Sequence, residues 1–460
     1  MSDAPAPTRP SFMPPPMPVP RKALIVAYAF PPVGGAGVQR VSKLAKYLPQ
    51  HGFKPSVLTT ENPSVPLTDE SLARDLPLDL EIIRARSLEP GYAAKKVAWA
   101  AAADVKPSKK KQLVRFATGM VRQLAYPDVQ MLWVPGASAA LLGVLRKKAP
   151  DVVVISGPPF SQFLLAPLAR TRSAVVLDYR DEWSLIRESY EMTQSRIARI
   201  IGDPLEAALL RTAHMVTTAT EEFRQNLLDR FKFLDPSTVV AIPNGYDPED
   251  FPSDLPAPRT DKFVVSHVGT VLKLTSPKGL LGAIKKLHAR EPDLAKLMVV
   301  RFVGRIVDLE AAAFEGMEEL GVQRIGYMDH DDAVRALAES QLVLVILDDT
   351  TGVERIYPAK IFEAMFIGRP SLTLAPDGAL TRLVEKHKIG DRLPPRDEDA
   401  IASLLAEKLR AFRDGRPIPT PRPIGIAQYD RRAIAGRFAD VMREAVKRAR
   451  GPARAASMAT

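Results

Sequence analysis

The hydrophobic residues fall into short apolar runs, each followed by a loop and then by an amphipathic helix. The first run spans 22–30, and in the helix after it Val38, Val41, Leu44 and Leu48 lie on one face. Similar runs recur at 53–59, 80–85, 151–156, 173–178, 263–268, 299–303, 323–328, 342–347 and 371–374. Short runs that are apolar throughout are typical of strands buried on both faces of a parallel sheet. The alternation therefore predicts an α/β fold with doubly wound parallel sheets.

The length of 460 residues is too great for one ordinary hydrophobic core, so we expect two domains. Shifts in composition divide the chain into a disordered proline-rich tail at 1–20, a first domain at 21–246, a linker at 247–258, a second domain at 259–427, a helix at 428–448 and a tail at 449–460. The helix near the C-terminus has an apolar stripe made of Ile434, Phe438, Val441 and Ala445. Such a stripe must be buried against another element.

The segment 354–370, ERIYPAKIFEAMFIGRP, carries the clearest chemical signal. The run at 342–347 and a polar loop precede it, and a helix begins near Pro358, because proline loses no hydrogen bond in a first turn. A helix start at the end of a strand presents free backbone N–H groups that bind phosphate. Lys360 could then contact a phosphate and Glu363 a diol, since a carboxylate accepts two hydrogen bonds. An exposed ion pair is the alternative explanation of these two residues.

The sequence PAKIFEAMFIGRP resembles the motif PxKxxExxAxGxP of retaining, family-4-like glycosyltransferases, which have the GT-B fold. The resemblance implies two Rossmann-like domains that face a cleft, with the C-terminal helix crossing back to the first domain. It also implies that Glu363 binds the ribose hydroxyls of a sugar nucleotide. Many members carry another glutamate earlier in the chain and near the donor sugar, with seven residues between it and the ribose-binding glutamate. Arg355 stands at that position here, Glu354 precedes it as the candidate for the catalytic role, and Phe366 replaces the motif alanine.

The loop at 31–37 resembles the PPxGGxG loop of the same enzymes. The resemblance implies that Gly34, Gly35 and Gly37 lie over the donor phosphates and face the acceptor, and glycine permits such a close approach of the backbone to an anion. By themselves the glycines indicate only a tight turn. The second motif, at 354–370, favours the functional interpretation.

Other parts of the first domain also resemble elements of this family. Segment 126–137 resembles PDxxxxWxPxA, and segment 239–247 resembles the IPNGxD signature that ends the first domain. The run at 173–178 leads into YRDEW, in which Arg180 and Asp181 resemble the RD of an RDxW element. The resemblance implies that these two residues position the acceptor hydroxyl or the donor sugar. They could equally hold their loop to a neighbouring helix.

The loop that opens the second domain is a further candidate for binding phosphate. Its strand ends in Gly269 and Thr270, and Lys278 begins the next helix. Family members commonly hold the donor diphosphate here with an arginine after the glycine and with a lysine. Lys278 matches that lysine and would offset the charge on the leaving diphosphate, although an ordinary surface lysine is the alternative. Thr270 replaces the arginine, so Lys273 or Arg305 would supply the second cation.

Tyr327 lies where these enzymes hold the nucleotide base. Asp329 and Asp331 nearby have the DxD spacing of metal-dependent transferases, but Asp331 and Asp332 are better explained as capping residues at a helix start. The chain contains no cysteine, which excludes disulfides and thiolate metal sites. The resemblance further implies that no metal and no cofactor are needed, with the nucleotide sugar as a co-substrate.

The net charge of +11 is concentrated at 95–122. The basic residues there are Lys95, Lys96, Lys106, Lys109, Lys110, Lys111, Arg115 and Arg122. Apolar residues alternate with them, which suits an anionic membrane surface. Nucleic acid is less favoured because no binding motif for it is present, and a solvated loop stays open as an alternative. No apolar run has the length of a membrane span, and the N-terminus has no signal-peptide core. We therefore expect a cytoplasmic protein, peripheral at the inner face of the cell membrane.

These patterns and the resemblance predict a retaining glycosyltransferase that moves a sugar from a nucleotide diphosphate sugar to an acceptor hydroxyl. The acceptor would be a polysaccharide or a lipid-linked glycan. The family favours front-face attack, from the side on which the diphosphate leaves. Two alternatives stay open: a sugar-nucleotide epimerase on the same fold, and a catalytically silent membrane-bound scaffold in which the missing arginine and the shifted Glu354 reflect decay.

Overall fold

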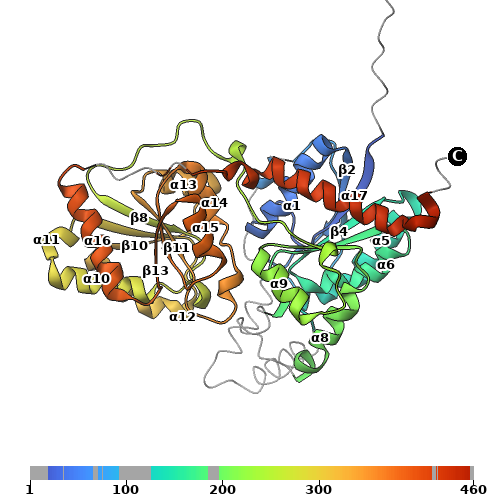
Figure 1. Cartoon of the computed structure of the whole chain (residues 1–460), viewed down its shortest axis with the longest axis horizontal. Helices are drawn as coiled ribbons and strands as arrows, with labels where there is room; N and C mark the ends of the chain where they lie inside the picture. Colours follow the sequence, from blue (N-terminus) through green and yellow to red (C-terminus); the bar gives the residue numbers. More distant parts are fainter. Residues whose placement is uncertain are drawn as a thin grey trace, which may run out of the picture.

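Two α/β domains lie side by side in the structure, a computed structural model, and the last helix runs from one domain to the other (Figure 1). The structure describes residues 19–34, 36–65, 71–74, 76–92, 126–184, 196–416, 421 and 423–455. Gly35, the basic segment 95–122 and nearly all of the tail at 1–20 lie outside the described residues. The predictions made for them stay predictions.

The first domain is built on a seven-stranded sheet in which all neighbouring strands are parallel. Its strands are β1 (Arg21–Val26), β2 (Phe53–Thr60), β3 (Glu81–Ala85), β4 (Val152–Gly157), β5 (Ala174–Tyr179), β6 (Met215–Thr218) and β7 (Val239–Ala241). They lie in the order β3-β2-β1-β4-β5-β6-β7. The chain therefore winds outward in both directions from the central pair β1 and β4.

The second domain repeats this plan with a six-stranded sheet, again parallel throughout. Its strands are β8 (Phe263–Val268), β9 (Met298–Val303), β10 (Val322–Ile325), β11 (Leu342–Ile346), β12 (Ser371–Leu374) and β13 (Gly390–Leu393). The order is β10-β9-β8-β11-β12-β13, with β8 and β11 as the central pair. The predicted fold class, two doubly wound parallel-sheet domains, is confirmed.

Helices connect the strands in both domains. In the first they are α1 (Ala36–Tyr47), α2 (Ser71–Arg74), α5 (Val134–Lys147), α6 (Ala166–Arg170), α8 (Arg196–Leu210) and α9 (Glu221–Arg230). In the second they are α10 (Lys278–Arg290), α11 (Pro292–Ala295), α12 (Asp308–Ala311), α13 (His330–Ala338), α14 (Lys360–Ile367), α15 (Ala379–His387) and α16 (Glu398–Arg413), followed by α17 (Arg431–Ala455). The 3₁₀ turns are η1 (Leu48–His51), η2 (Val129–Trp133), η3 (Phe160–Leu165), η4 (Pro236–Thr238), η5 (Pro248–Asp250), η6 (Lys273–Thr275), η7 (Ala312–Phe314), η8 (Glu318–Leu320), η9 (Val353–Arg355) and η10 (Ile426–Tyr429).

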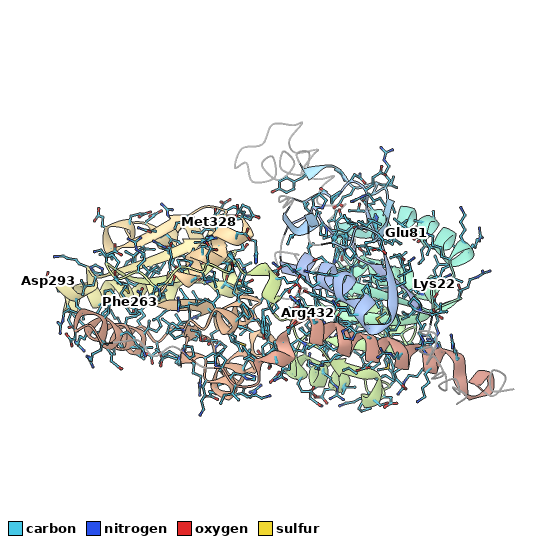
Figure 2. All side chains as sticks on the ribbon, turned by 90° about the horizontal axis from the view of Figure 1, so that it is seen from above. Lys22, Glu81, Phe263, Asp293, Met328 and Arg432 are labelled. Carbon is cyan, nitrogen blue, oxygen red and sulfur yellow. The ribbon has the colours of Figure 1, made fainter. Side chains whose placement is uncertain are left out.

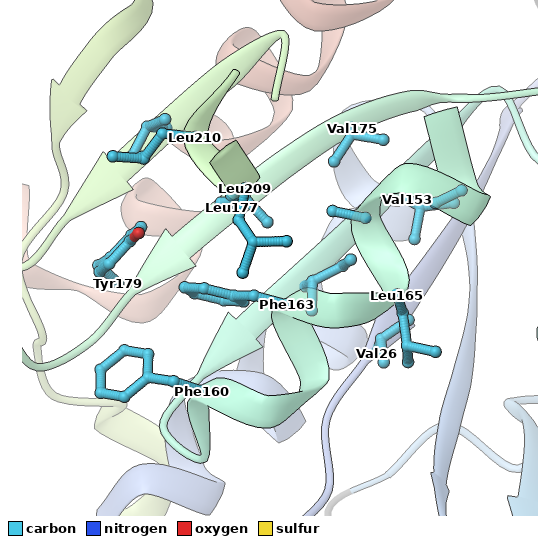
Figure 3. Packing of buried hydrophobic residues seen from close by; sticks show 14 of the residues in the cluster. Val26, Val153, Phe160, Phe163, Leu165, Val175, Leu177, Tyr179, Leu209 and Leu210 are labelled. Carbon is cyan, nitrogen blue, oxygen red and sulfur yellow. The ribbon is translucent and has the colours of Figure 1, made fainter. Parts of the chain in front are cut away.

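Both faces of each sheet are buried, which explains why the central strands are apolar throughout. Along β1, Leu24 and Val26 point into one core, while Ala23 and Ile25 point into the other. Figure 3 shows the first of these cores, in which Phe163 from η3 packs against the sheet. The second domain has the same two-sided arrangement around β8 and β11.

Two predicted strands are longer than the observed ones. The run at 22–30 continues past the end of β1, and the run at 323–328 continues past the end of β10. Phe30 shows the reason, because it is only 1% exposed although it lies in a loop. A loop residue that fills the core has the same apolar character as a strand residue, so hydrophobicity alone does not mark the strand end.

Helix α17 crosses back and packs on the first domain, as predicted. Its buried residues in the core shared with β1 and α1 include Ile434, Phe438, Val441 and Ala445. The helix spans Arg431–Ala455, with one break in helical geometry at Gly451 (φ +61°). It therefore starts later and extends further than the predicted range 428–448.

Two chain segments run side by side where the domains meet. The backbone N–H of Tyr246 donates to the carbonyl oxygen of Tyr429 (3.0 Å), and the N–H of Arg431 donates to the carbonyl oxygen of Tyr246 (2.9 Å). Gly245 is required because a Cβ atom there would lie 1.9 Å from the carbonyl oxygen of Tyr429. Arg432 marks this junction in the view from above (Figure 2).

Aromatic rings attach the linker to the second domain. The ring of Phe366, on α14, lies 4.9 Å from the ring of Tyr246 and 4.4 Å from the ring of Phe251, measured between centroids. Contacts of this kind stabilise beyond their buried area. The position at which this chain departs from the motif alanine is therefore used to hold the linker.

One helix among the described residues, Val129–Lys147, is long and apolar enough to cross a membrane by length and composition alone. The sequence predicted no segment long and apolar enough to span a membrane, and by length and composition this prediction is wrong. The helix combines η2 and α5, and its residues Trp133, Ala137, Leu141, Val144 and Leu145 are buried in the first core. A helix that covers an apolar sheet needs this composition, which explains the result.

Candidate functional site

Each sheet reverses its strand order at one point, between β1 and β4 in the first domain and between β8 and β11 in the second. Open parallel sheets bind ligands beyond the carboxyl ends of the strands at such a point. The loops that leave these four strands include residues 31–37, 157–160, 269–277 and 347–355. Most residues predicted for the site lie on these loops or at the helix starts that follow them.

The ion pair between Lys360 and Glu363 lies at the start of α14, beyond β11. The Nζ atom of Lys360 is 2.9 Å from each carboxylate oxygen of Glu363. Only 8% of the Glu363 side chain and 26% of the Lys360 side chain are exposed, so the pair is not the solvated surface pair of the alternative explanation. The carboxylate has lone pairs for further hydrogen bonds, and a helix start favours its negative charge.

Arg431 adds a cation from the crossover helix near this pair. Its side chain is buried, and its Nη1 atom has no hydrogen-bond partner among the described residues. The pKa of Arg431 is lowered to about 10, chiefly by burial and also by the charge of Arg40, while Asp250, Asp247 and Glu363 act in the opposite direction. No pattern in the sequence connects positions 431 and 363, because their proximity depends on how α17 crosses between the domains.

The loops after β8 and β9 touch at two glycines. Gly269 and Gly304 have φ values of +153° and +122°, and a Cβ atom on Gly304 would lie 2.5 Å from the carbonyl oxygen of Gly269. Both positions therefore favour glycine. Thr270 and Arg305, which follow these glycines, are exposed. The structure thus brings the predicted residues Gly269 and Arg305 into neighbouring loops at one sheet edge.

The remaining donor-side candidates are accessible. Lys278 is the first residue of α10, and 62% of its side chain is exposed. Its Nζ atom lies 3.3 Å from the buried carboxylate of Glu310, which also accepts a hydrogen bond from Ser276 (2.6 Å). Lys273 and Tyr327 are exposed as well. These positions fit a ligand-facing edge, and the roles of the residues stay predictions.

His267, near the end of β8, was missed by the sequence analysis. Its ring is buried, and Nδ1 lies 3.2 Å from the carbonyl oxygen of Leu344. A carbonyl only accepts, so Nδ1 carries the proton and Nε2 is an acceptor. Nε2 has no partner among the described residues and lies 3.5 Å from the place of a Cβ on Gly269. Burial lowers the pKa of His267 to about 4, so the ring is neutral at pH 7.

Arg180 connects two loops of the first domain. Its guanidinium donates to the carbonyl oxygens of Gly157 (3.3 Å), Pro158 and Gly37. A Cβ atom on Gly37 would lie 2.7 Å from Nη1 of Arg180, so the glycine allows this approach. These contacts fit the alternative explanation, in which Arg180 holds its loop to a neighbouring element. Gly34 is half-buried in the same loop.

Asp181 faces a small pocket between the domains, which is also lined by Glu182, Asn244, Arg355 and Tyr357. The pocket encloses about 40 Å³, the space of one or two water molecules. The side chain of Asp181 is open to solvent there. The surrounding protein nevertheless removes part of its hydration and raises the pKa of Asp181, against the attraction of Arg180.

A buried ion pair joins α1 to β5 in the first domain. Arg40, from α1, makes a two-point contact with Asp178 at the end of β5 (2.8 and 3.1 Å). Ser156 and Thr217 also donate to Asp178, each at 2.7 Å. Burial would raise the pKa of Asp178, but the charge and hydrogen bonds of its partners outweigh burial and lower it. The sequence could not reveal this pair because its members come from different strand–helix units.

Arg355, at the position of the family glutamate, points to the first domain. Its Nε lies 2.6 Å from one oxygen of Glu182, and its Nη2 lies 3.3 Å from the other. Nη1 contacts Glu354, whose carboxylate also accepts the N–H of Gly352 (2.8 Å). Glu354 is thus engaged within its own turn, and its catalytic role stays a prediction.

Two of the family-like elements of the first domain, segment 126–137 and the RDxW element, meet at Trp183. Its ring stacks on Phe160 (centroids 4.9 Å apart, planes at 2°) and on Tyr126 (6.2 Å, 27°). Asp128 accepts the N–H groups of Phe160 (2.6 Å) and Ser161 (3.0 Å). These contacts fix the loop that carries Arg180 and Asp181.

Asp329 explains the DxD-like spacing. Its side chain accepts the N–H of Asp332 (3.0 Å) and caps α13, while Asp331 and Asp332 lie in the first turn. The capping explanation is right for this helix start, although the cap itself is Asp329. In the part of the chain that the structure describes, no group of three or more His, Asp or Glu side chains is arranged to hold a metal ion.

Two facing doubly wound domains joined by a linker and a returning helix define the GT-B fold. Solved structures of similar shape cover nearly the whole chain. Sucrose-phosphate synthase from Thermosynechococcus elongatus gives a TM-score of 0.57 at 16% identity, covering 93% of this chain and 94% of that one. HepE from Anabaena, in complex with UDP and glucose, gives 0.53 at 15% identity, covering 95% and 100%. A glycosyltransferase from Rickettsia africae gives 0.55 at 14% identity, covering 93% and 99%. Likeness at these identities establishes the fold.

Sequence comparison identifies the family of the first domain. Residues 34–245 match the family of glycosyl transferase 4-like domains. A D-inositol 3-phosphate glycosyltransferase from Stackebrandtia nassauensis is 26% identical over 208 residues, which are 43% of this chain. The match covers 46% of that relative, so less than half of its length is represented. The family predicted from the motifs is confirmed.

Proposed function

We propose that this chain is a retaining glycosyltransferase that moves a sugar from a nucleotide diphosphate sugar to an acceptor hydroxyl. The observation that carries the proposal is the buried pair of Lys360 and Glu363 at a helix start, beyond the central strands of a GT-B domain. The glycosyl transferase 4-like first domain supports the class of reaction. A relative named as a glycosyltransferase and a neighbour that binds UDP and glucose point the same way.

In this proposal Glu363 accepts hydrogen bonds from the ribose hydroxyls of the donor. Lys360 and the free N–H groups of the α14 start contact the donor phosphates. Lys360 already holds both oxygens of the carboxylate, so Glu363 is oriented before the donor arrives. Because the carboxylate is already oriented, less conformational entropy is lost when the donor binds.

The loop after β8 completes the donor site. Lys278 would offset the charge that develops on the leaving diphosphate, and Gly269 allows the backbone to approach it. Lys273 or Arg305 supplies the cation that stands in for the family arginine. Tyr327 borders the nucleobase. No metal and no cofactor enter this scheme, because the cations and helix starts provide the electrostatic stabilisation.

The acceptor hydroxyl lies at the pocket between the domains, whose volume of one or two water molecules admits the reacting group and not the whole acceptor. Arg180 fixes the glycine loop through its three carbonyl contacts, and Asp181 positions the acceptor hydroxyl. Attack comes from the side on which the diphosphate leaves, so the anomeric configuration is retained. The hydroxyl proton passes to the departing phosphate oxygen.

A donor screen tests the proposal. UDP-, GDP- and ADP-sugars are incubated with the protein, and release of nucleotide diphosphate is followed by chromatography. Transfer or slow donor hydrolysis supports the proposal, and proton NMR of the product shows whether the configuration is retained. Interconversion of UDP-sugars would support the epimerase instead. Failure of every nucleotide to bind would support the silent scaffold.

Substitution of Glu363 tests the site itself. Glu363→Gln keeps the shape but removes the charge, and we expect the donor KM to rise about tenfold or more, with a lower kcat, because charge-assisted hydrogen bonds are lost. The matched control is Glu444→Gln, which breaks an exposed pair of the same spacing with Lys447. Kinetics that do not differ between the two variants would remove Glu363 from the site.

We further propose that the acceptor is a polysaccharide or lipid-linked glycan and that the protein is cytoplasmic and peripheral at the inner membrane face. The basic segment 95–122 supports this proposal by its charge and apolar content. Replacing Lys109, Lys110 and Lys111 by glutamine should weaken sedimentation with vesicles that contain anionic lipid. Unchanged sedimentation would contradict the membrane proposal.

A further inference from the structure

Three side-chain contacts join the two domains at the candidate site. Arg355 pairs with Glu182 (2.6 and 3.3 Å), and Arg382 pairs with Glu222 (2.6 and 3.0 Å). The hydroxyl of Thr220 donates to the carbonyl oxygen of Arg355 (2.7 Å). The acids and Thr220 belong to the first domain, and both arginines belong to the second. The contacts therefore depend on the relative position of the domains.

The pair between Arg355 and Glu182 is the most protected of these contacts. The exposed fractions of the two side chains are 21% and 3%, against 58% and 24% for Arg382 and Glu222. Glu182 also accepts hydrogen bonds from Ser184 and Asn226, which orient its carboxylate. A two-point contact between a guanidinium and an oriented carboxylate fixes both distance and angle. This pair thus defines a single geometry for the domains.

The pair also lies in the pocket between the domains. Glu182 and Arg355 line it together with Arg180, Asp181 and Asn244. The pocket is narrow, so a shift of about 1 Å between the domains would separate groups that must act together, and such a shift can cost roughly a hundredfold in rate. Glu182 follows Asp181 directly, so the pair holds the acceptor-side loop against the turn that precedes α14.

We propose that Arg355 and Glu182 are positioning residues that align the two halves of the active site. This inference rests on the proposed transferase function. It also gives a physical account of the departure from the family glutamate: at position 355 this chain has a guanidinium that reaches the other domain. The pairs of Arg382 with Glu222 and of Thr220 with Arg355 support the same alignment from the edge.

Kinetics of single and double variants test the alignment. Glu182→Gln and Arg355→Gln should each lower kcat roughly tenfold to a hundredfold. The donor KM should change less than threefold, because most of the proposed donor contacts lie on the second domain. The double variant should be no slower than the slower single variant, since the pair acts as one unit. Effects that multiply in the double variant would overturn the proposal.

A distance measurement tests the alignment without any activity. The chain has no cysteine, so spin labels can be placed on one exposed residue of each domain, by Lys232→Cys and Lys296→Cys. Arg355→Gln should broaden the interdomain distance distribution. Arg392→Gln, which breaks ion pairs within the second domain only, should leave it unchanged. An unchanged distribution in Arg355→Gln would overturn the proposal.

Two further outcomes separate the possible failures. If Arg355→Gln does not fold, Arg355→Lys is used, which keeps the charge but loses the two-point contact and should also broaden the distribution. If no nucleotide sugar is turned over by the unaltered protein, the proposed function fails. The distance measurement then still decides whether the pair aligns the domains.

Discussion

Replacing Asp178 by asparagine would leave the guanidinium of Arg40 charged and buried. Arg40 is 2% exposed and would lose the charge of its two-point partner. Breaking a buried pair by removing one member costs about 3–5 kcal/mol. We expect about 3 kcal/mol, because Arg40 keeps the carbonyl oxygens of Ile242 (2.9 Å) and Pro243 (3.1 Å). The asparagine also keeps one acceptor for the neighbouring hydroxyls.

Urea unfolding at pH 7, followed by tryptophan fluorescence, measures this loss. The pKa of Asp178 is below its ordinary value, so the carboxylate is charged at pH 7 and its contribution is lost only as the pH falls through the folded-state pKa. Asp229→Asn is the control, because it breaks an exposed pair with Lys232 and should change the free energy of unfolding far less. A loss for Asp178→Asn as small as that of the control would refute the reasoning.

Three other predictions concern stability and metal dependence. In the unfolded chain His267 binds a proton near pH 6.5, whereas in the folded protein it does so only near pH 4. The free energy of unfolding should therefore decrease as the pH drops, by roughly 2–3 kcal/mol at pH 4.5. In His267→Gln the free energy of unfolding, measured with urea, should depend less on pH, and an equal dependence would contradict the assignment. Phe366→Ala should lower the unfolding free energy by roughly 2 kcal/mol, because the ring contacts with Tyr246 and Phe251 are lost; equal denaturation midpoints would show that the ring does not hold the linker. Transfer activity should survive EDTA, and loss that a divalent cation restores would contradict metal independence.

The fold could be predicted because its signals are local. Strands buried on both faces must be apolar throughout, so runs such as 151–156 identified the sheets directly. The stripe of α17 identified a helix that packs on another element. Strand ends were harder to place, since Phe30 is as deeply buried in a loop as a strand residue is in the sheet. At such positions a residue is buried without belonging to a strand. The apolar sequence indicates the burial, but it does not indicate where the hydrogen bonding of the strand ends.

The candidate site could be predicted only where one segment carries it. Lys360 and Glu363 lie one helical turn apart, so their pairing follows from local geometry. Arg355 pairs with Glu182, and Arg431 lies near Glu363; both residues are far away in the sequence, and no spacing rule connects them. His267 was missed for another reason: inside an apolar run, a histidine with one backbone partner looks like any other core residue.

The returning helix has a consequence for how the chain is made. Residues of α17 complete the core that faces β1 and α1, yet they are synthesised after the whole second domain. At 5–20 residues per second, the ribosome takes on the order of 10–40 s to reach them. During that interval the apolar face of the first-domain sheet that α17 will cover stays exposed. Folding of the first domain can finish only after α17 has been translated. The second domain can therefore finish folding before the first, in an order opposite to the usual N-terminal-first sequence.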